Sequence, residues 1–258
     1  MPTLLTPVIA HRGAQIVCPE NTIAAFREAI KLGADSIEFD VHASNDGHLV
    51  VHHDVDLSRT TSGSGLIHRR SLEYLRGLDA GSWFDERFSG ERIPMLSEVL
   101  ALEGVRFELE LKGIPSQEFV SALARAVADA DAVGRTEFTG HSHVALLGLR
   151  ERLPAARLGL FPRPRQPWMS SSLFGDVTLA TALTGRFAVV HLWLHEREGI
   201  DIEQFQAAGV SVHLQATPDS SRDELVQAFL VADQVGVDDV EVALRLRSEL
   251  SEGRQFPP

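Results

Sequence analysis

The amino-acid sequence predicts an α/β protein, with residues 1–258 forming a single (β/α)8 TIM-barrel domain. Short apolar segments alternate with segments of helical periodicity, an order typical of parallel strands joined by crossover helices. Eight strand–helix units can be counted, and 258 residues is an ordinary length for one such barrel. A hydrophobic fraction of 44% and a charged fraction of 23% are typical of a globular protein with a full core.

The first strand is predicted at residues 7–11, and Gly33 ends the helix that is predicted over residues 21–33. The other seven strands are predicted at residues 35–41, 106–112, 136–141, 157–161, 187–193, 210–215 and 238–244. Helical periodicity predicts further helices at residues 95–104, 117–132, 143–154, 201–209 and 223–236.

Residues 48–54 form a ninth strand candidate that cannot be a parallel neighbour of the second strand. The connection over residues 42–47 is a tight turn containing Asn-Asp-Gly, whereas parallel neighbours need a crossover of a dozen or more residues. We therefore expect this segment to fold back from the end of the second strand. Residues 55–93 are rich in turn formers and are predicted to be a small insertion that caps the barrel.

The charge and cysteine content narrow the classes of function. A formal net charge of -12 disfavours nucleic acid and anionic membrane surfaces as partners. Cys18 is the single cysteine, so no intramolecular disulfide can form. We find neither a secretory signal nor an apolar segment long enough to span a bilayer. We expect a cytoplasmic protein without a stable membrane anchor, and leave open whether it forms a homodimer.

Charged and imidazole side chains gather where the predicted strands end, which is where barrel enzymes place their active sites. The candidates are His11 and Arg12 after the first strand, Glu38 and Asp40 on one face of the second, Glu108, Glu110 and Lys112 on one face of the third, and His52, His53 and Asp54 after the fold-back segment. Each set alone has an alternative interpretation: the carboxylates fit a solvent-facing edge strand, and a histidine at a strand end is more often a structural hydrogen-bonding group. Inside a closed barrel, however, the strands have no solvent face, so these charges need a site or compensation.

The residue types indicate a particular chemistry. Three carboxylates on adjacent strands suit a hard divalent cation such as Mg²⁺ or Ca²⁺, and the lack of a cysteine cluster argues against structural zinc. Two histidines with an arginine and a lysine beside such a cation suggest a small-molecule phosphate ester as substrate. One imidazole can act as base or nucleophile while the other protonates the leaving alcohol.

Several motifs, in this order, resemble the glycerophosphodiester phosphodiesterase family across roughly the first 112 residues. They occupy residues 11–13, 19–41, 46–54, 59–65, 78–84, 93–100 and 110–112. The resemblance implies a metal-dependent (β/α)8 enzyme that hydrolyses glycerophosphodiesters to glycerol 3-phosphate and an alcohol. It also implies that a substrate hydroxyl attacks phosphorus to give a cyclic phosphate, which is then hydrolysed.

Carried over to this sequence, the resemblance implies a role for each matching residue. His11 and His53 become the catalytic pair, Glu38, Asp40 and Glu110 the metal ligands, Arg12 and Lys112 the phosphate contacts, and Glu20 a supporting residue. We add Asp54 and Glu108 as supporting candidates, and expect Glu108 to lie deeper and to matter less for the metal.

The distal half departs from the family pattern, which puts the substrate-binding wall in doubt. Residues 210–218 read VSVHLQATP where a Trp-Thr-Val-Asn type of motif is usual, and VEVALR replaces a Thr-Asp-x-Pro ending. Trp193 is either a replacement aromatic platform or one more core tryptophan. For His141, His143, His191, His195 and His213, a place in the wall and a structural or surface role both stay open.

Three functions therefore compete. The first is a glycerophosphodiester phosphodiesterase, the second a related phospholipase of the C or D kind, and the third a non-catalytic binding barrel. The acidic chain without an amphipathic anchor argues against the second. Retention of both histidines and all three carboxylates argues against the third.

Overall fold

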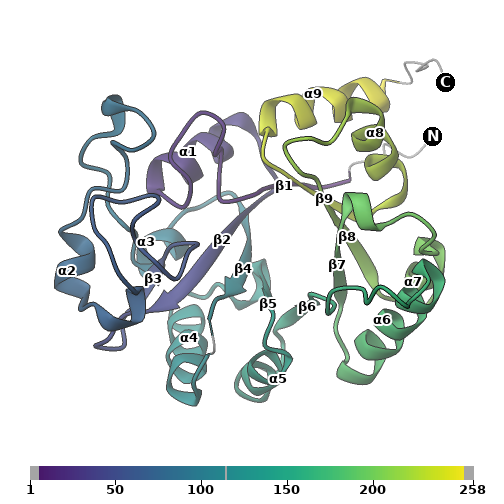
Figure 1. The fold of residues 1–258 in the computed structure, drawn as a ribbon, viewed down its shortest axis with the longest axis horizontal. Helices are drawn as coiled ribbons and strands as arrows, with labels where there is room; N and C mark the ends of the chain where they lie inside the picture. Colours follow the sequence, from purple (N-terminus) through teal and green to yellow (C-terminus); the bar gives the residue numbers. More distant parts are fainter. Residues whose placement is uncertain (1–5, 114, 253–258) are drawn as a thin grey trace.

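A computed structural model describes residues 6–113 and 115–252 of the chain. Its strands are β1 (Val8–Ala10), β2 (Ser36–Ala43), β3 (Leu49–Val51), β4 (Arg106–Leu111), β5 (Thr136–Gly140), β6 (Arg157–Leu160), β7 (Val189–Trp193), β8 (Ser211–Gln215) and β9 (Gln234–Val237). They form one sheet in the spatial order β1-β9-β8-β7-β6-β5-β4-β2-β3, and a parallel pairing of β1 with β2 closes it (Figure 1). The predicted (β/α)8 fold is confirmed.

The helices surround the closed barrel. They are α1 (Ile23–Leu32), α2 (Leu72–Arg76), α3 (Leu96–Leu100), α4 (Gln117–Asp129), α5 (His143–Arg152), α6 (Ser171–Gly185), α7 (Ile202–Ala207), α8 (Arg222–Val231) and α9 (Val240–Ser251). Within the described part of the chain, no helix is both long and apolar enough to cross a membrane.

Alternation along β2 and β4 separates the hydrophobic core from the barrel interior. Phe39 of β2 packs edge to face between Phe26 of α1 and Phe107 of β4, with ring centroids 5.8 and 5.7 Å apart. The residues between these aromatic side chains point the other way, into the barrel. The parallel register sets Glu38 beside Glu108 and Asp40 beside Glu110. The same alternation that builds the core therefore aligns the acidic residues inside.

The ninth strand candidate folds back on the second strand, as the short turn between them predicts. β3 pairs antiparallel with β2, with Val41 opposite Val51, and lies outside the closed circle of parallel strands. The chain then runs through an excursion that carries α2 beside β3 (Figure 1). This excursion has a small apolar cluster of its own, made of Val50, Leu57, Ile67, Leu75, Ala80 and Ile93.

The prediction for the last strand is wrong. Residues 238–244 are not a strand: Asp239 caps α9 by accepting from the backbone N–H of Val242, and the last strand is β9. The valines at 240 and 242 resemble a strand in sequence, yet Val240, Ala243 and Leu246 bury one face of a helix. The predicted helix over residues 223–236 is also too long. The helix α8 ends at Val231, and the last residues of the predicted segment belong to β9.

The helix α6 is absent from the sequence-based prediction because its apolar residues lie all round it. Phe174 and Leu179 are buried against the barrel, whereas Leu173, Val177 and Leu183 are exposed on the outer side. Such a segment has no single apolar stripe at helical spacing.

The glycine in β9 is required by its neighbours, which yields a test of the corrected strand. A Cβ at Gly236 would lie 2.5 Å from Nε2 of His213 and 2.0 Å from Oε1 of Gln215. Gly236→Ala should lower the free energy of unfolding by about 1–3 kcal/mol, the usual cost of overpacking. Gly134→Ala is the control, because a Cβ there meets nothing within 4 Å. Denaturant melts with equal midpoints for the two variants would contradict the placement of β9.

Candidate active site

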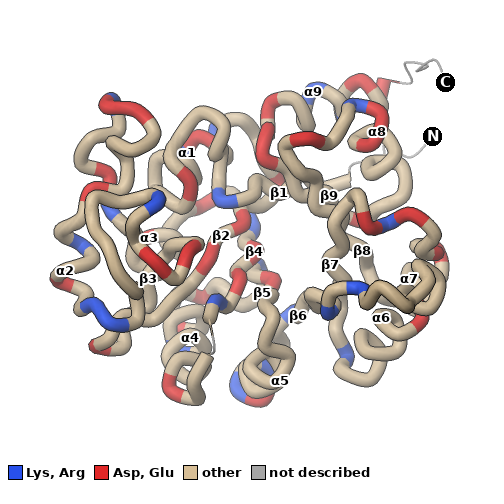
Figure 2. Tube along the Cα trace, in the orientation of Figure 1, with Lys and Arg blue, Asp and Glu red and all other residues tan. Residues whose placement is uncertain are grey.

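Most of the predicted site residues meet in one cavity at the carboxyl ends of the strands, and the buried Asp40 lies beside it against Lys112. The cavity has a volume of about 180 Å³ and is lined by His11, Arg12, Glu38, His53, Glu108, Glu110, Lys112, His141, Phe161, His191, Leu192, Trp193 and Gln215. Figure 2 shows acidic segments along β2 and around β4, with basic segments beside them. Side chains that are far apart in the sequence therefore share one small volume.

Three buried carboxylates form the acidic part of the site. Glu38, Asp40 and Glu110 each offer one oxygen, and these oxygens lie within 4.8 Å of one another. Burial and the neighbouring Asp40, Glu108 and Glu110 carboxylates raise the pKa of Glu38 well above its usual value. Burial and Asp40 likewise raise the pKa of Glu110 to about 7. The cluster has more negative charge than its own surroundings neutralise.

Two cationic side chains compensate part of this charge. Lys112 Nζ lies 3.0 Å from Asp40 Oδ1 and 2.8 Å from Glu110 Oε2. Although burial acts to raise it, the pKa of Asp40 is held far below its usual value by Lys112, His53 and Arg12. The Arg12 backbone N–H donates to Glu38 Oε2 at 2.9 Å, from a left-handed conformation with φ 55°. Such a conformation costs a non-glycine residue about 1–3 kcal/mol and is typical of functional sites.

The donor set fits a hard divalent cation. Among the described residues, Glu110 Oε1 is a buried atom without a hydrogen-bond partner, and all three groups supply oxygen. Mg²⁺ and Ca²⁺ prefer such carboxylate oxygens. A cation at this position would stabilise the ionised forms of Glu38 and Glu110, whose raised pKa values reflect burial and the repulsion of neighbouring carboxylates.

His11 is oriented by a residue that the sequence reasoning missed. Its Nδ1 lies 2.7 Å from Asp238 Oδ1, directly after β9, and 3.0 Å from Gln15 Nε2. A hydrogen bond from Nδ1–H to the carboxylate leaves Nε2 as the other functional nitrogen. The sequence predicts Asp238 at the start of a strand over residues 238–244. Its true position, directly after the carboxyl end of β9, is the signal that would have identified it.

His53 is oriented in a similar way, by its chain neighbour. Its Nδ1 lies 2.6 Å from Asp54 Oδ1, and Arg59 Nε binds the other oxygen of Asp54 at 2.6 Å. Arg59 also forms a two-pronged pair with Glu20, at 2.7 and 2.8 Å, and Glu20 receives Arg12 Nη1 at 2.9 Å. A continuous chain of ion pairs therefore joins His53 to Arg12, which places the predicted supporting residues Glu20 and Asp54 beside the site.

The pKa of His53 is lowered, mainly by burial and also by Lys112 and Arg12, against the opposing effect of Asp40. Its neighbour His52 points away from the cavity, as alternation along an extended segment predicts. His52 is buried, with Nδ1 2.9 Å from the Asp54 carbonyl oxygen and Nε2 3.1 Å from Thr60 Oγ1. We interpret it as a structural residue of the excursion.

The distal histidines divide between wall, core and surface. His141 and His191 line the cavity, together with Phe161 and the half-exposed Trp193, which is therefore not a core tryptophan. His143 Nε2 donates to the Phe161 carbonyl oxygen at 3.0 Å, and His143 does not line the cavity. The exposed His195 lies against Trp193, and the buried His213 lies beneath the wall, beside Glu108.

Glu108 lies beside Glu38 but faces two histidines of its own. Although burial acts to raise it, the pKa of Glu108 is lowered to about 2 by His213 and His191. Glu108 in turn raises the pKa of His213 against the effect of burial. As predicted from alternation, Glu108 lies one layer deeper than Glu110.

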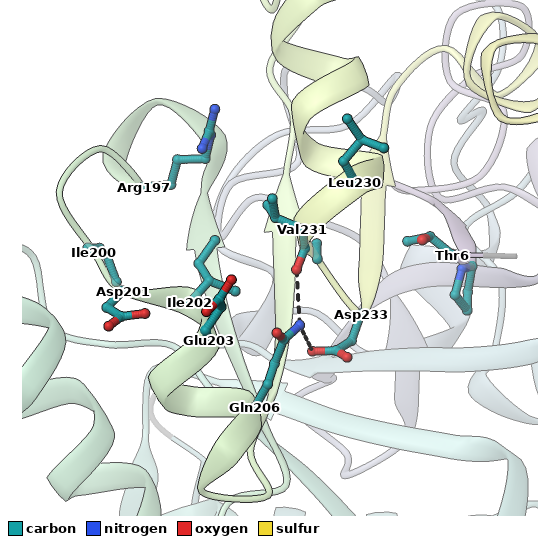
Figure 3. A pocket seen from close by; sticks show the side chains of 12 residues that line it. Thr6, Arg197, Ile200, Asp201, Ile202, Glu203, Gln206, Leu230, Val231 and Asp233 are labelled. Carbon is teal, nitrogen blue, oxygen red and sulfur yellow. Dashed lines mark hydrogen bonds between the residues drawn. The ribbon is translucent and has the colours of Figure 1, made fainter. Parts of the chain in front are cut away.

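A second hollow, of about 640 Å³, lies away from these residues, between α7 and the end of α8 (Figure 3). Its lining includes Asp201, Glu203 and Asp233, and Gln206 Nε2 donates to the Val231 carbonyl oxygen at 3.0 Å and to Asp233 Oδ2 at 3.2 Å. None of the predicted site residues lines it. The smaller cavity at the strand ends is therefore the candidate active site.

The resemblance seen in the first 112 residues extends further along the chain when the whole sequence is compared with known families. The glycerophosphoryl diester phosphodiesterase family matches residues 11–214. The chain belongs to this family. A glycerophosphodiester phosphodiesterase of Caldanaerobacter subterraneus is 41% identical over 160 residues, which are 60% of this chain and 66% of the relative. A glycerophosphodiester phosphodiesterase of Bacillus subtilis is 42% identical over 109 residues, 38% of this chain and 37% of the relative. The matched sequence thus spans less than two thirds of either relative.

Solved structures of the glycerophosphoryl diester phosphodiesterase family extend the likeness over nearly the whole chain. A glycerophosphodiester phosphodiesterase from Agrobacterium tumefaciens is 30% identical, with a TM-score of 0.75 over 92% of this chain and 99% of that one. An Oleispira antarctica phosphodiesterase, in complex with the product sn-glycerol-3-phosphate, is 28% identical. Its TM-score is 0.80, over 94% of this chain and 96% of that one.

The ion-pair chain beside the active site of this glycerophosphoryl diester phosphodiesterase family member should make stability depend on pH. The pKa of Asp54 lies below its usual value, chiefly because Arg59 binds it. Although burial acts to raise it, the pKa of Glu20 is also lowered, by Arg59 and Arg12. A lowered carboxyl pKa stabilises the fold above the unfolded-state value, about 3.9–4.3, and this contribution is lost as pH falls through the folded-state value.

Arg59→Gln should therefore lower the free energy of unfolding by roughly 1 kcal/mol at pH 6–7, and by less at pH 3, because the contribution begins to fall below the unfolded-state pKa and is lost only as pH passes the folded-state value. Lys31→Gln, which breaks the exposed pair of Lys31 with Glu28, is the matched control and should have little effect at either pH. Urea melts at the two pH values provide the measurement. An Arg59→Gln effect that does not shrink in acid would contradict the role given to this ion-pair chain.

Proposed function

We propose that the chain hydrolyses glycerophosphodiesters to glycerol 3-phosphate and an alcohol, with a bound Mg²⁺ or Ca²⁺. One observation carries this proposal: two imidazoles, each bound through Nδ1 to a carboxylate, share a cavity with a cluster of buried carboxylates, Arg12 and Lys112. Family membership and the names of the relatives support it. The Oleispira antarctica neighbour, which holds sn-glycerol-3-phosphate, supports the same class of product.

Glu38, Asp40 and Glu110 would hold the cation. When bound, a divalent cation supplies positive charge to the phosphoryl oxygens. Lys112 and Arg12 border the same cavity, and their ammonium and guanidinium groups suit the remaining phosphoryl charge. The Arg12 backbone N–H to Glu38 and the ion pair of Arg12 with Glu20 hold the guanidinium in place.

The two histidines supply acid–base catalysis on opposite sides of phosphorus. One imidazole takes the proton of the attacking substrate hydroxyl, whose oxygen forms the new bond to phosphorus. The other imidazole gives its proton to the leaving alcohol as the second phosphorus–oxygen bond breaks. Water then opens the cyclic phosphate with the roles reversed, which returns both protons to their starting positions.

The Nδ1 hydrogen bonds suit this exchange. The carboxylate of Asp238 faces His11 and that of Asp54 faces His53, and a carboxylate at Nδ1 stabilises the protonated ring. The lowered pKa of His53 favours its neutral form before substrate binds. We expected His53 to be the general acid, and the assignment of acid and base stays a prediction.

The size of the cavity favours a short diester over an intact phospholipid. A volume of about 180 Å³ suits a glycerol phosphate group better than the acyl chains of an intact lipid. The leaving alcohol would face the wall of His141, Phe161 and Trp193. Gln215, from the segment 210–218 that departs from the family pattern, also lines the cavity, so we keep the prediction of an unusual preference among alcohols.

A turnover assay tests the proposed function directly. Glycerophosphocholine should be cleaved in the presence of Mg²⁺ or Ca²⁺, and activity should be lost with a chelator and regained with added metal. Glu110→Gln should reduce metal affinity and activity together, because it removes a charged ligand. Full activity of Glu110→Gln in chelated buffer, or no turnover of any glycerophosphodiester by the metal-loaded wild type, would overturn the proposal.

His11→Ala and His53→Ala should each lower turnover by about 10²-fold or more, the usual scale for general acid–base catalysis. The double variant should lose less than the product of the single effects, because the pair acts as a unit. His52→Ala is the neighbouring control and should be milder. A nitrophenyl ester, which needs no proton donor, should rescue only the variant that lacks the acid. Single losses below about tenfold would contradict the paired assignment.

A further inference from the structure

A second cluster of metal-ligating side chains lies one layer below the carboxylate cluster. Glu108, His191 and His213 come from β4, β7 and β8, and each side chain is almost fully buried. Their ligating atoms lie within 4.8 Å of one another, and the two imidazole centroids are 4.3 Å apart. Nothing in the proposed hydrolysis uses the two histidines.

Hydrogen bonds on the outer side fix the orientation of both rings. His191 Nε2 lies 2.8 Å from Glu137 Oε1, and Arg157 Nε holds the other oxygen of Glu137 at 3.0 Å. His213 Nε2 lies 3.3 Å from Gln215 Oε1, and the Gln215 amide is oriented by its Nε2, which donates to the Ala216 carbonyl oxygen at 3.0 Å. Both acceptors call for a proton on Nε2, so both rings turn Nδ1 inward.

The inward nitrogens face the same carboxylate. His191 Nδ1 lies 3.4 Å from Glu108 Oε1, and His213 Nδ1 lies 3.2 Å from Glu108 Oε2. With the Nε2 protons in place, neutral imidazoles direct lone pairs at carboxylate oxygens, which also carry lone pairs. Gln234 Nε2 lies 3.3 Å from His213 Nδ1, and Glu108 Oε2 has no hydrogen-bond partner among the described residues. A cation between the three groups would satisfy Glu108 Oε2 and the Nδ1 lone pairs, and Gln234 Nε2 would keep its hydrogen bond to Glu137 Oε1 at 3.1 Å.

The lack of a side chain at two glycines lets the backbone pack directly against the imidazole rings of His191 and His213. A Cβ at Gly159 would lie 2.5 Å from Nε2 of His191, and a Cβ at Gly236 would lie 2.5 Å from Nε2 of His213. The backbones of β6 and β9 therefore pack directly against the imidazoles. Ligands held this firmly are preorganised, which favours a bound ion over alternative ring positions.

We propose that Glu108, His191 and His213 form a second metal site, which takes a borderline transition-metal ion such as Zn²⁺ through one carboxylate and two Nδ1 nitrogens. Imidazole ligands select Zn²⁺ and its neighbours, whereas the oxygen-only cluster above selects Mg²⁺ or Ca²⁺. The donor separations of 3.2 and 3.4 Å agree with the roughly 3.3 Å expected between ligands of a tetrahedral zinc with bonds of about 2.0–2.1 Å.

The surroundings complete the pattern of a metal site. Glu137 and Gln215 take the place of the outer acceptors that orient metal-bound histidines. Glu108 and His191 line the active-site cavity, so an ion can reach the site and keep one position open toward that cavity. This inference does not depend on the proposed hydrolysis, because it concerns a different set of ligands.

Metal binding by matched variants tests the second site. His191→Gln and His213→Gln each replace the ring by an amide that can still donate to Glu137 or to the Gln215 side chain, but remove the Nδ1 ligand. After chelation, loading with Zn²⁺ and gel filtration, wild type and Glu110→Gln should keep one tightly bound zinc per chain, and both histidine variants should lose it. Zinc retained by the histidine variants, or lost only in Glu110→Gln, would overturn the proposal.

A measurement on the wild type keeps the test decisive if the variants fail to fold. Cobalt(II) bound by two histidines shifts the imidazole N–H protons far outside the normal proton range. Co²⁺-loaded protein should show two such exchangeable signals, from Nε2–H of His191 and of His213, and a strong visible absorption typical of tetrahedral cobalt. Neither feature would appear if protons alone held the cluster together, and that outcome would overturn the second site while leaving the proposed hydrolysis intact.

Discussion

The constraint on which the rest of the structure depends is the burial of several carboxylates inside a closed barrel. Glu38, Asp40 and Glu110 have almost no contact with solvent, and their ligand oxygens lie within 4.8 Å of one another. Ionised groups in such a position are costly unless cations face them. Lys112 and Arg12 compensate Asp40 most directly, so burial and the remaining repulsion raise the pKa values of Glu38 and Glu110. A divalent cation is the group that would remove this repulsion.

The same constraint explains why the loops beside the site are so heavily paired. Arg12 must turn its backbone N–H toward Glu38 and its guanidinium toward Glu20, and it does so in a left-handed conformation that a non-glycine residue seldom adopts. Asn21 adopts a similar conformation and donates to Asp40 Oδ2 at 2.7 Å. The pair of Arg59 with Glu20 and Asp54 extends this support to His53. The strain at two residues is thus held by a network that also positions the catalytic candidates.

Sequence reasoning succeeded where a short motif and a local rule agreed. Alternation along residues 35–41 and 106–112 gave the shared facing of the carboxylates, and the short turn before β3 gave its antiparallel pairing. It failed where tertiary contacts decide the local structure. Val240 and Val242 favour a strand, but the Asp239 cap and the buried face of α9 override that preference, and the error hid Asp238. No local pattern could show that His191 and His213 meet Glu108, because their contact depends on closure of the barrel.

The two halves of the barrel direct different side chains into its interior. The proximal strands β2 and β4 contribute buried carboxylates, with Lys112 directly after β4, whereas the distal strands β7 and β8 contribute imidazoles that reach Glu108 from the opposite wall. Glu108 is the residue where the two sets meet, since it is a register neighbour of Glu38 and its oxygens lie 3.4 and 3.2 Å from Nδ1 of His191 and His213. The distal departures from the family pattern therefore have a physical counterpart. They place nitrogen ligands and an aromatic wall opposite an oxygen-rich cluster, and they leave that cluster intact.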